Sequence, residues 1–398
     1  MHPADELRGS TSKKLFQKRI VLGVTGSIAA VESVRVAREL IRHGAEVIPV
    51  MTAAATRIIH PDALEFATGN KPVVELTGKT EHVFFCGLAE DPVDLMLISP
   101  CTANTISKIA LDVDDTPVTT FASTAIGSQI PILIVPAMHL SMYNHKQLQK
   151  NIKQCKQRGI RFVGPSLTGK KAKVAERDEI VAHTMRVIGT QDLAKKKILV
   201  IGGATAEPID DIRVLTNRSS GKTAVALAKN AFERGADVEV WYGHGEERVP
   251  SYISVKSFET LDDLIKLIKT GKLKQFDSII VCAALANYRP VRYKGKIPSG
   301  KKELVVTMTA APRVIQKLKS GAPGAQLIAF KVEQNKTTVE QKSYELLKDT
   351  KLDFVIGNTV AAFGKDESEI WIIDTKGKGV YKKGKKEELA KYILDNVT

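Results

Sequence analysis

One pattern constrains the fold of this chain more than any other. An apolar segment, a turn, an amphipathic segment and a second apolar segment follow one another once in each half of the sequence. In the first half, apolar residues 18–26 precede a helical stretch that stops at Gly44, and apolar residues 45–52 follow it. In the second half, residues 198–201 and the helical stretch 223–234 repeat this order. Such β-α-β units build parallel sheets that are covered by helices.

The two units are related by sequence as well as by order. Residues 42–47 read RHGAEV and residues 233–238 read ERGADV, each where the helix gives way to the next strand. We interpret this as two separate doubly wound, Rossmann-like α/β domains rather than a solenoid repeat, with residues 18–190 forming the first and residues 191–398 the second. Residues 1–17 are polar and have no apolar core, which predicts a loose N-terminal arm.

The bulk composition leaves several classes of partner open. The chain has 398 residues, of which 43% are hydrophobic and 6% aromatic, and its formal net charge is +15. This charge can reflect nucleic acid, phosphorylated small molecules or only a soluble surface, but the sparse aromatics and the lack of zinc-finger spacing disfavour nucleic acid. No apolar run approaches the ~20 residues of a membrane span. The four cysteines have no paired spacing and fit a reducing cytoplasm.

In the first domain, the loops after the predicted strands carry the candidate ligand groups. The first turn contains Gly23 and Gly26 without the G-x-G-x-x-G spacing of dinucleotide sites, so a mononucleotide such as a flavin phosphate is as plausible there as NAD. The predicted strands 93–99 and 130–135 run into further polar loops. Because ligands of open α/β sheets gather at the carboxyl ends of strands, we expect all three loops to face one site.

In the second domain, the segment NRSSGK at residues 217–222 precedes the helical stretch 223–234. Small donors, two cations and the N–H groups of a helix start suit a phosphate or a carboxylate, although a solvated, capped turn has the same composition. A further apolar strand, 276–282, leads into AALANYRP at 283–290. The loop beyond it suits a polyphosphate or is simply a solvated basic loop, and contains four lysines: Lys294, Lys296, Lys301 and Lys302.

The histidines give only a weak signal by themselves. A histidine can move protons in both directions near neutral pH, but a lone one is more often structural. His82 lies ahead of the predicted strand 93–99, and on residue type alone His60, His139 and His145 are equal candidates.

Taken together, these segments resemble the family of bifunctional phosphopantothenoylcysteine decarboxylase / phosphopantothenate–cysteine ligase enzymes of coenzyme A biosynthesis. Three motifs resemble the ligase: EPID at 207–210, NRSSGK at 217–222 and AALANYRP at 283–290. Four motifs resemble the flavin-containing decarboxylase: GSIAA at 26–30, the pair EH at 81–82, PCTANT at 100–105 and PAM at 136–138. The resemblance extends from about residue 18 to residue 397 and is closer to archaeal than to bacterial members.

The resemblance implies that the first half is a flavodoxin-like domain that binds FMN and decarboxylates 4′-phosphopantothenoylcysteine to 4′-phosphopantetheine. Two electrons pass from the cysteine moiety to the flavin, the resulting thioaldehyde is the electron sink for loss of carbon dioxide, and the electrons then return. His82 is the proton-handling residue by position. Six residues are expected to contact FMN: Gly26, Ser27, Ile28, Thr52, Ser99 and Thr102. Four are expected to contact the substrate: Asn104, Met138, His139 and Met142.

Two departures from the family pattern bear on the decarboxylase. His139 stands where the family often has the asparagine that grips the substrate carboxylate, and a histidine can still donate a hydrogen bond there. Bacterial members carry a cysteine in a mobile clamp that the final reduction step needs, whereas residues 166–176 contain none. Lys170, Lys171 and Lys173 are the candidates there, either to bind the substrate phosphate or to donate the closing proton. An alternative is therefore a working ligase joined to a non-catalytic flavin-binding half.

For the second half, the resemblance implies a nucleotide-driven ligase. The carboxylate of 4′-phosphopantothenate attacks the α-phosphate of a nucleoside triphosphate, expected to be CTP, and the amine of cysteine then displaces CMP from the acyl-nucleotide. Asn217 would hold this intermediate, Lys296 would be catalytic, and Mg²⁺ would neutralise the triphosphate. Asn287 replaces the family's aspartate, which weakens the prediction that the nucleotide is CTP rather than ATP. The other expected contacts are Ala283, Ala284, Pro312, Val314 and Phe330.

The resemblance also implies a homo-oligomer. Decarboxylase domains of the family form trimers and ligase domains form dimers, and the two symmetries together give a dodecamer. Two alternatives outside the family are an NAD-dependent oxidoreductase, which the missing glycine motif disfavours, and a basic nucleic-acid-binding protein. The sequence identifies no protein ligands for a metal.

Overall fold

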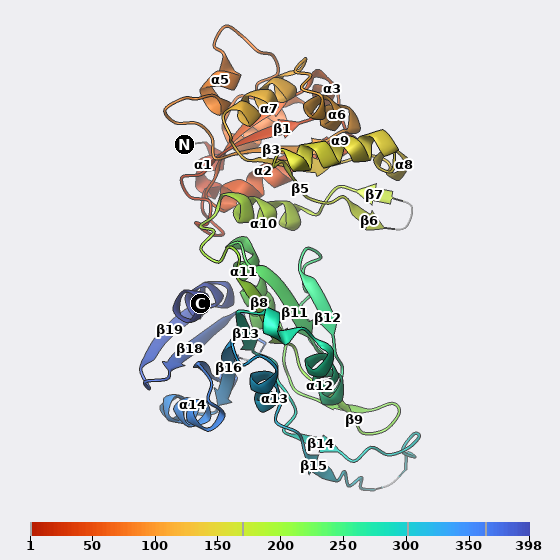
Figure 1. Cartoon of the computed structure of the whole chain (residues 1–398), viewed down its shortest axis with the longest axis vertical. Helices are drawn as coiled ribbons and strands as arrows, with labels where there is room; N and C mark the ends of the chain where they lie inside the picture. The colour runs from red at the N-terminus through yellow and green to blue at the C-terminus, as the bar shows by residue number, and fades with distance from the viewer. Residues whose placement is uncertain (1, 169–170, 301, 363) are drawn as a thin grey trace. The chain divides into compact units, whose positions relative to one another are not determined.

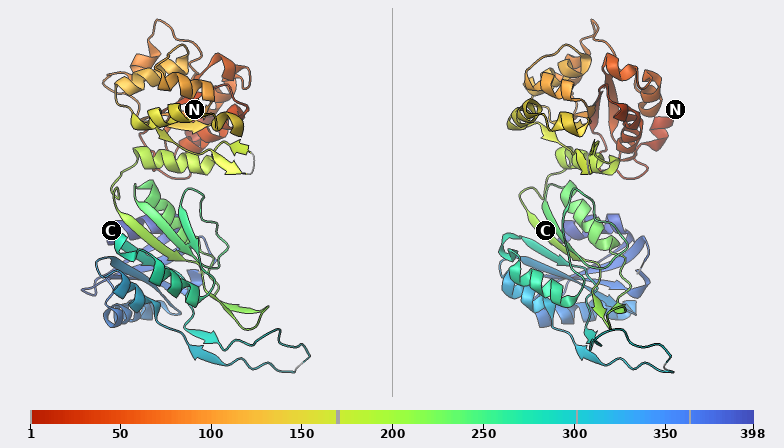
Figure 2. Two further views of the ribbon diagram at one scale, coloured as in Figure 1. Left: turned by 45° about the vertical axis from the view of Figure 1, so that its right-hand side comes forward. Right: turned by 90° about the vertical axis from the view of Figure 1, so that its right-hand side faces the viewer.

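The computed structural model describes residues 2–168, 171–300, 302–362 and 364–398 (Figure 1). The chain divides into two compact units, the first ending at Gln191 and the second running from Asp192 to Thr398. The boundary predicted after residue 190 lies one residue from this division. Each unit is built around a sheet of its own with helices packed on it (Figure 2).

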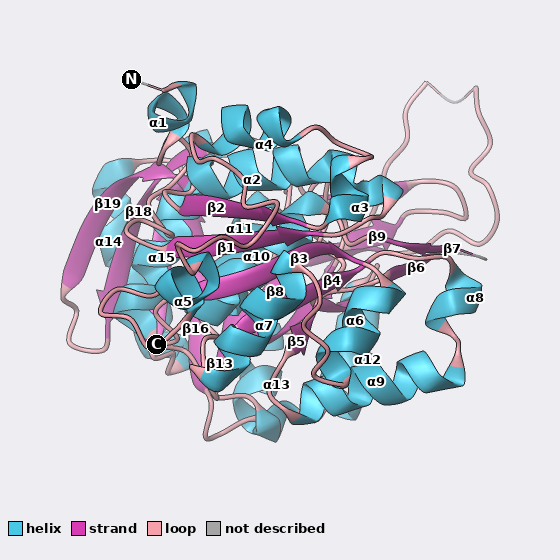
Figure 3. Ribbon diagram, turned by 90° about the horizontal axis from the view of Figure 1, so that it is seen from above, coloured by secondary structure: helices cyan, strands magenta, loops and turns pink. Residues whose placement is uncertain are grey.

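The first unit contains a five-stranded parallel sheet in the order β2-β1-β3-β4-β5. Its strands are β1 (Arg19–Val24), β2 (Glu46–Met51), β3 (Leu95–Cys101), β4 (Ile132–Pro136) and β5 (Arg161–Phe162). Figure 3 shows β2, β1, β3 and β4 in this order. β1, β2, β3 and β4 are buried almost throughout, as expected of apolar strands that are covered on both faces.

Two layers of helix cover this sheet. Buried side chains of α1 (Pro3–Leu7), α2 (Ser33–Arg42), α4 (Pro61–Thr68) and α10 (Arg177–Ile188) belong to one core cluster. Those of α5 (Glu81–Cys86), α6 (Ala103–Ala110), α7 (Pro117–Gly127) and α9 (Lys146–Gln157) belong to the other. The remaining elements are η1 (Ile28–Glu32), α3 (Ala53–Thr56), α8 (Leu140–Tyr143) and the hairpin of β6 (Ser166–Thr168) and β7 (Lys171–Lys173).

The N-terminal segment is part of the first unit, so the prediction of a loose arm is wrong. Ala4 and Leu15 are fully buried in the core. The N–H of Gly9 donates to the carbonyl of Ile41 over 3.0 Å, and the Arg8 guanidinium donates to the carbonyl of Ala45 over 2.6 Å. The polar composition concealed this packing, because two buried apolar side chains are enough to dock a short segment.

The second unit has an eight-stranded sheet in the order β12-β11-β8-β13-β16-β17-β18-β19. Six strands are parallel: β8 (Lys197–Gly202), β11 (Asp237–Tyr242), β12 (Ser254–Ser257), β13 (Ser278–Val281), β16 (Gln326–Glu333) and β17 (Phe354–Thr359). β18 (Glu367–Asp374) and β19 (Gly379–Lys385) extend the sheet with antiparallel pairing. The lysine-rich β19 is an edge strand, where charge discourages pairing with another chain.

Helices and two small ladders complete the second unit. α12 (Leu261–Thr270), η2 (Leu273–Gln275), α13 (Val314–Gly321) and α14 (Lys336–Thr350) contribute to one core cluster, while α11 (Lys222–Glu233) packs against α15 (Lys386–Val397). β9 (Ala206–Pro208) pairs with β10 (Val214–Thr216), β14 (Tyr288–Pro290) pairs with β15 (Met308–Ala310), and η3 (Val360–Ala362) follows β17. Two doubly wound α/β domains were predicted, and this prediction is confirmed.

Replacing Leu15 with alanine should destabilise the first unit by about 2–5 kcal/mol, since it deletes a fully buried side chain and leaves a cavity. Differential scanning calorimetry of the full chain measures the shift. The exposed neighbour Lys13, replaced with alanine, is the matched control and should leave the melting temperature unchanged. Equal melting temperatures for the two variants would mean that the segment does not support the fold.

Candidate active sites

In the first unit, three predicted flavin contacts lie where adjacent strands end. Ser27, Thr52 and Thr102 follow β1, β2 and β3, and each is the N-cap of the next helix. Their hydroxyl oxygens accept the N–H groups of Ala29, Ala55 and Thr105 at 3.4, 3.2 and 3.3 Å. Three helix starts therefore meet one edge of the sheet, where their N–H groups favour an anion such as a phosphate.

Buried hydrogen bonds tie the ends of β1 and β3 together. The Thr25 hydroxyl donates to the carbonyl of Pro100 over 2.9 Å and accepts the N–H of Thr102 at 3.0 Å. The Ser33 hydroxyl donates to the carbonyl of Ser99 over 3.0 Å, and the Ser99 side chain is itself buried. The loop that holds Gly26 and Ser27 is thus fixed against the end of β3, which contains Ser99 and leads into Thr102.

Apolar surface lies beside these polar groups. Ile28 is 79% exposed and Val31 is 50% exposed, both on η1 directly after Ser27. A large exposed aliphatic side chain next to helix starts is what a molecule with a flat ring and a phosphate requires. The residues present therefore fit a flavin mononucleotide.

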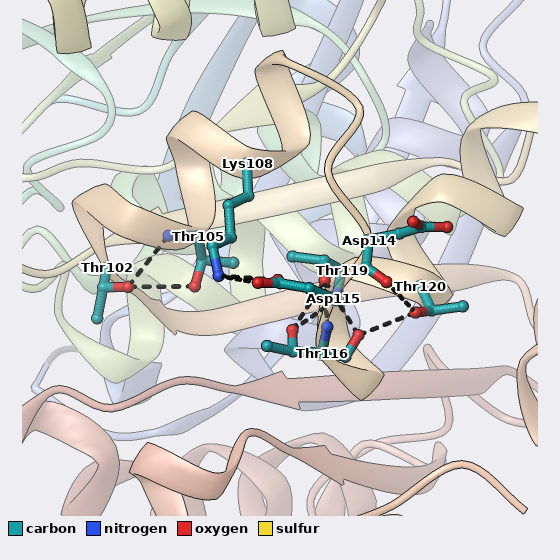
Figure 4. Close-up of polar contacts among 8 residues, drawn as sticks. All are labelled: Thr102, Thr105, Lys108, Asp114, Asp115, Thr116, Thr119 and Thr120. Atoms are coloured by element: carbon teal, nitrogen blue, oxygen red, sulfur yellow. Dashed lines mark hydrogen bonds and ion pairs between the residues drawn. The ribbon is translucent and has the colours of Figure 1, made fainter.

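A polar network holds α6 and α7 together (Figure 4). Lys108 on α6 forms an ion pair with Asp115 over 2.6 Å, directly before α7. Thr116 and Thr119 cap α7 reciprocally, and the Thr102 and Thr105 hydroxyls lie 3.1 Å apart at the start of α6. The Lys108–Asp115 ion pair links α6, which follows β3, to the start of α7.

His82 lies on α5, which packs against α7. Its ring meets that of Phe121 edge to face, with centroids 6.4 Å apart. Its Nδ1 is buried and has no hydrogen-bond partner within the described part of the chain. A ring nitrogen that the fold does not use is available to a ligand, which suits a proton-transfer role.

The four predicted substrate contacts follow β3 and β4, which are neighbours in the sheet. Asn104 is exposed near the start of α6, Met138 is half-buried, and Met142 is 50% exposed on α8. His139 caps α8: its Nδ1 accepts the N–H of Ser141 at 3.3 Å, which leaves Nε2 for other contacts.

The predicted clamp region, residues 166–176, includes the β6–β7 hairpin, which contacts α8. Lys170 lies outside the described residues. Cys155 on α9 is fully buried, and burial raises the pKa of its thiol to about 11. A buried thiol with this pKa cannot replace an accessible cysteine in the clamp.

In the second unit, one cavity of about 740 Å³ opens at the carboxyl ends of β13 and β16. Asn217 lines it, and the Asn217 Nδ2 donates to the carbonyl of Ala284 over 2.9 Å. The other predicted residues in its lining are Ala283, Ala284, Asn287, Pro312, Val314 and Phe330. Three cations also line it: Arg218, one of the two cations of the NRSSGK segment, and Arg313 and Lys331, which the sequence reasoning missed. Arg313 directly follows the predicted Pro312, and this adjacency was the available signal.

A smaller cavity of about 100 Å³ shares Ala283, Ala284 and Phe330 with the first and reaches the start of α11. Gly221 is the N-cap of α11 with φ +78°, and a Cβ there would collide with the Tyr242 hydroxyl, so only glycine fits. Lys386 lines this cavity from the start of α15, far along the chain from any predicted site residue.

The structure does not bring Lys296 into either cavity. Lys296 is exposed on the long connection between β14 and β15 and is absent from both linings. Its neighbour Ile297 is buried and donates its N–H to Asp210 Oδ2 over 3.0 Å. The described residues contain no group of three or more His, Cys, Asp or Glu side chains that could hold a metal ion. They also contain no helix long and apolar enough to cross a membrane.

Residues 8–189 match the family described as Flavoprotein, and residues 193–398 match the family described as DNA/pantothenate metabolism flavoprotein C-terminal domain. The chain is 42% identical to the coenzyme A biosynthesis bifunctional protein CoaBC of Thermococcus kodakarensis, an alignment that covers 100% of this chain and 99% of the relative. The chain belongs to this family. The CoaBC of Methanocaldococcus jannaschii is 37% identical over 100% of this chain and 97% of its own length.

Among solved structures, the C-terminal domain of a coenzyme A biosynthesis bifunctional protein CoaBC is similar, with 25% identity and a TM-score of 0.44 over 52% of this chain and 96% of that one. Family membership confirms the prediction of a decarboxylase and a ligase in one chain. It also confirms that the first half is a flavoprotein domain.

Replacing Asp210 with asparagine should loosen the connection that carries Lys296. Burial of Asp210 opposes ionisation, but the N–H groups of Ile297, Arg213 and Ile212 and the Arg213 guanidinium outweigh it and hold the pKa of Asp210 below its usual range. A carboxylate with a lowered pKa in the folded state adds stability above its unfolded pKa of about 3.9 and loses it as the pH falls.

The Asp210→Asn variant should therefore be less stable than the wild type at pH 7, and the difference should shrink below about pH 4. Thermal unfolding at both pH values measures it. Asp211→Asn changes the exposed neighbour and is the control. If the stability difference between the wild type and Asp210→Asn is the same at both pH values, the Asp210 carboxylate does not have this role.

Proposed function

We propose that the second unit ligates 4′-phosphopantothenate to cysteine through an acyl-nucleotide formed from CTP, and that the first unit decarboxylates the product with FMN as cofactor. The observation that carries the proposal is the cavity lined by Asn217 together with six further predicted contact residues, which come from the loop after β13, the segment at the start of α13 and β16. These residues are far apart in the sequence, so a shared lining supports a shared ligand.

The ligase chemistry needs positioning and charge neutralisation rather than a protein nucleophile. The carboxylate of 4′-phosphopantothenate attacks the α-phosphate, and pyrophosphate leaves. Arg218 and Arg313 line the cavity and supply the positive charge that this step requires, whereas Lys331, which also lines it, forms an ion pair with Glu333 over 2.9 Å. Mg²⁺ accompanies the triphosphate for the same reason. Asn217 holds the acyl-nucleotide while the amine of cysteine displaces CMP.

The nucleotide preference depends on Asn287. Its side chain lines the cavity, and its carbonyl accepts the N–H of Ala311 at 2.9 Å, which fixes the backbone there. An asparagine amide both donates and accepts, whereas an aspartate only accepts. Cytosine and adenine both present donors and acceptors that an amide can meet, so ATP is the competitor to be measured against CTP.

In the first unit, the helix starts after β1, β2 and β3 would hold the flavin phosphate, and Ile28 would pack on the ring. When bound, FMN supplies a reversible two-electron acceptor. His82 moves the substrate proton through the ring nitrogen that the fold leaves unused. His139, with Nδ1 engaged by Ser141, would offer Nε2 to the substrate carboxylate.

One observation favours a second candidate function, a ligase whose first half binds flavin without catalysis. Residues 166–176 contain no cysteine, and the nearest cysteine along the chain, Cys155, is buried with a raised thiol pKa. The two candidates differ only in the fate of 4′-phosphopantothenoylcysteine.

The proposal includes assembly into a homo-oligomer, with trimers of the first unit and dimers of the second. Large apolar side chains exposed on the first unit support a subunit contact there: Ile28 at 79%, Leu88 at 92% and Phe84 at 59%. It also includes a cytoplasmic location, which the four unpaired thiols, Cys86, Cys101, Cys155 and Cys282, support.

A coupled assay on the full, flavin-loaded chain tests the function. It contains 4′-phosphopantothenate, cysteine, Mg²⁺ and either CTP or ATP, with products identified by mass. Formation of 4′-phosphopantetheine with release of CMP is the expected result. Accumulation of 4′-phosphopantothenoylcysteine alone would favour the second candidate, and product formation with ATP only would overturn the assignment of CTP.

Replacing Asn217 with aspartate should reduce amide formation by about 100-fold or more and leave flavin bound, because a carboxylate repels the phosphate that the amide holds. The same assay measures it, with Asn335→Asp, an exposed position of the same unit, as control. Lys296→Gln tests the second predicted catalytic residue. Unchanged turnover in either variant would remove that residue from the site.

Replacing His82 with glutamine should slow decarboxylation of 4′-phosphopantothenoylcysteine by about 100-fold or more, since it removes a group that can exchange protons. Ligation should proceed at the wild-type rate, so the intermediate should accumulate. His145→Gln changes an exposed histidine that caps no helix with its side chain, and should leave both activities unchanged. If the two variants decarboxylate the intermediate at the same rate, His82 is excluded as the proton-transfer residue.

A further inference from the structure

The larger cavity of the second unit is lined by two helices, α13 and α14, as well as by the strand ends. Val281 of β13 and Ala329 of β16 pair with each other within the sheet, and both line the cavity. Val314 lines it from the start of α13, and Leu346 lines it from α14. Because these four side chains are apolar, this part of the cavity suits a flat group such as a nucleobase.

Asp349 is the one carboxylate in the lining of this cavity, as far as the described residues show. It is exposed, and no ion pair or side-chain hydrogen bond within the described part of the chain engages it. The acidic residues on either side of it differ. Glu345 accepts the Gln341 amide at 3.0 Å, and Asp353 forms an ion pair with Lys319 over 3.5 Å. Of these three carboxylates, only that of Asp349 is left to accept a hydrogen bond from a ligand.

The position of Asp349 is unfavourable for its own helix. Asp349 is the penultimate residue of α14, which is 15 residues long and ends at Thr350. The carbonyl groups at the C-terminal end of a helix carry partial negative charge, so a carboxylate there is destabilising. Thr350 also lines the cavity, but its hydroxyl donates to the Leu346 carbonyl over 2.5 Å, so its proton is used within the helix. This end of α14 therefore offers acceptors to the cavity, and a ligand group that donates would be stabilised there.

The cations of the cavity come from other elements. Arg218 follows β10, Arg313 is the N-cap of α13, and Lys331 lies within β16. Phosphates are stabilised by cations, whereas the exocyclic amine of a base is a neutral donor that a carboxylate accepts. A nucleotide therefore fits the cavity with its phosphates toward these cations and the amine edge of its base toward Asp349. The apolar lining beside Asp349 suits a base better than a ribose, which is polar on every side.

We propose that Asp349 accepts a hydrogen bond from the exocyclic amine of the nucleotide base, and that this contact selects nucleotides whose base carries such an amine. The inference rests on the ligase function proposed above. It applies to CTP and to ATP, because cytosine and adenine both carry the amine. Uracil and hypoxanthine carry a carbonyl at the same position, and a carbonyl oxygen that faces a carboxylate leaves two acceptors without a donor between them.

Calorimetric binding of matched nucleotides to the full chain, with Mg²⁺ present, tests the inference. CTP and UTP form one pair, and ATP and inosine triphosphate form the other, each pair exchanging an amine for a carbonyl on the base. The wild type should bind the amine-bearing member of a pair about tenfold more tightly. Asp349→Asn should bind this member more weakly and the other more tightly, since an amide can donate to the carbonyl. Glu345→Gln, on the same helix but outside the lining, should keep the wild-type preference.

The preference within a pair is a ratio measured on one variant, so a loss of folded protein cannot imitate its change. The measurement needs no turnover. If amide formation fails but Asp349→Asn still shifts the preference, the ligase proposal falls and this inference stands. An unchanged preference in both pairs would overturn the inference, and so would a failure of both pairs to bind. An equal loss of affinity for both members of a pair would also overturn it, because the contact would then be to the ribose, and 2′-deoxy-CTP would show no further loss.

Discussion

Both candidate sites depend on the parallel pairing of two strands at the centre of a sheet. In the first unit β1 pairs with β3, and in the second β8 pairs with β13. In the first sheet the chain runs from β1 to β2 on one side of β1 and returns to β3 on the other side. In the second sheet it runs from β8 to β11 and β12 on one side of β8 and returns to β13 on the other side. The carboxyl ends of each pair therefore open onto a crevice that no connection crosses, and loops from distant parts of the sequence meet there.

Hydrogen bonds across these crevices hold the loops in place before any ligand arrives. Thr25 joins the ends of β1 and β3, and Asn217 reaches the carbonyl of Ala284 beyond β13. Preorganisation of this kind matters for chemistry that depends on position more than on a protein nucleophile.

The cysteines of the first unit are buried in its core. Burial raises the pKa of Cys86 to about 12 and that of Cys155 to about 11, and it raises the pKa of Cys101 as well. These thiols pack as apolar side chains in the core. His82 differs, because its buried Nδ1 is left without a partner while its ring packs on Phe121.

The main parallel strands, the first helix of each β-α-β unit and the loops that follow the strands could be predicted from the sequence. Continuous apolar runs predicted the buried parallel strands, since a strand covered on both faces has no polar side to show. The polar loops that follow them were recognisable because strand ends in such sheets share one edge. The resemblance to the family named Asn217, Ala283 and Phe330, which line one cavity.

Other features were decided only by the tertiary structure. Lys386 reaches the cavity because α15 packs on α11 after the chain has added two antiparallel strands, and no local pattern marks such a contact. Lys296 is carried away from the cavities by a connection anchored at Asp210. The N-terminal segment docks through Ala4 and Leu15 in spite of its polar composition. Sequence periodicity reports which side of an element is buried, whereas long-range packing decides which other element covers it.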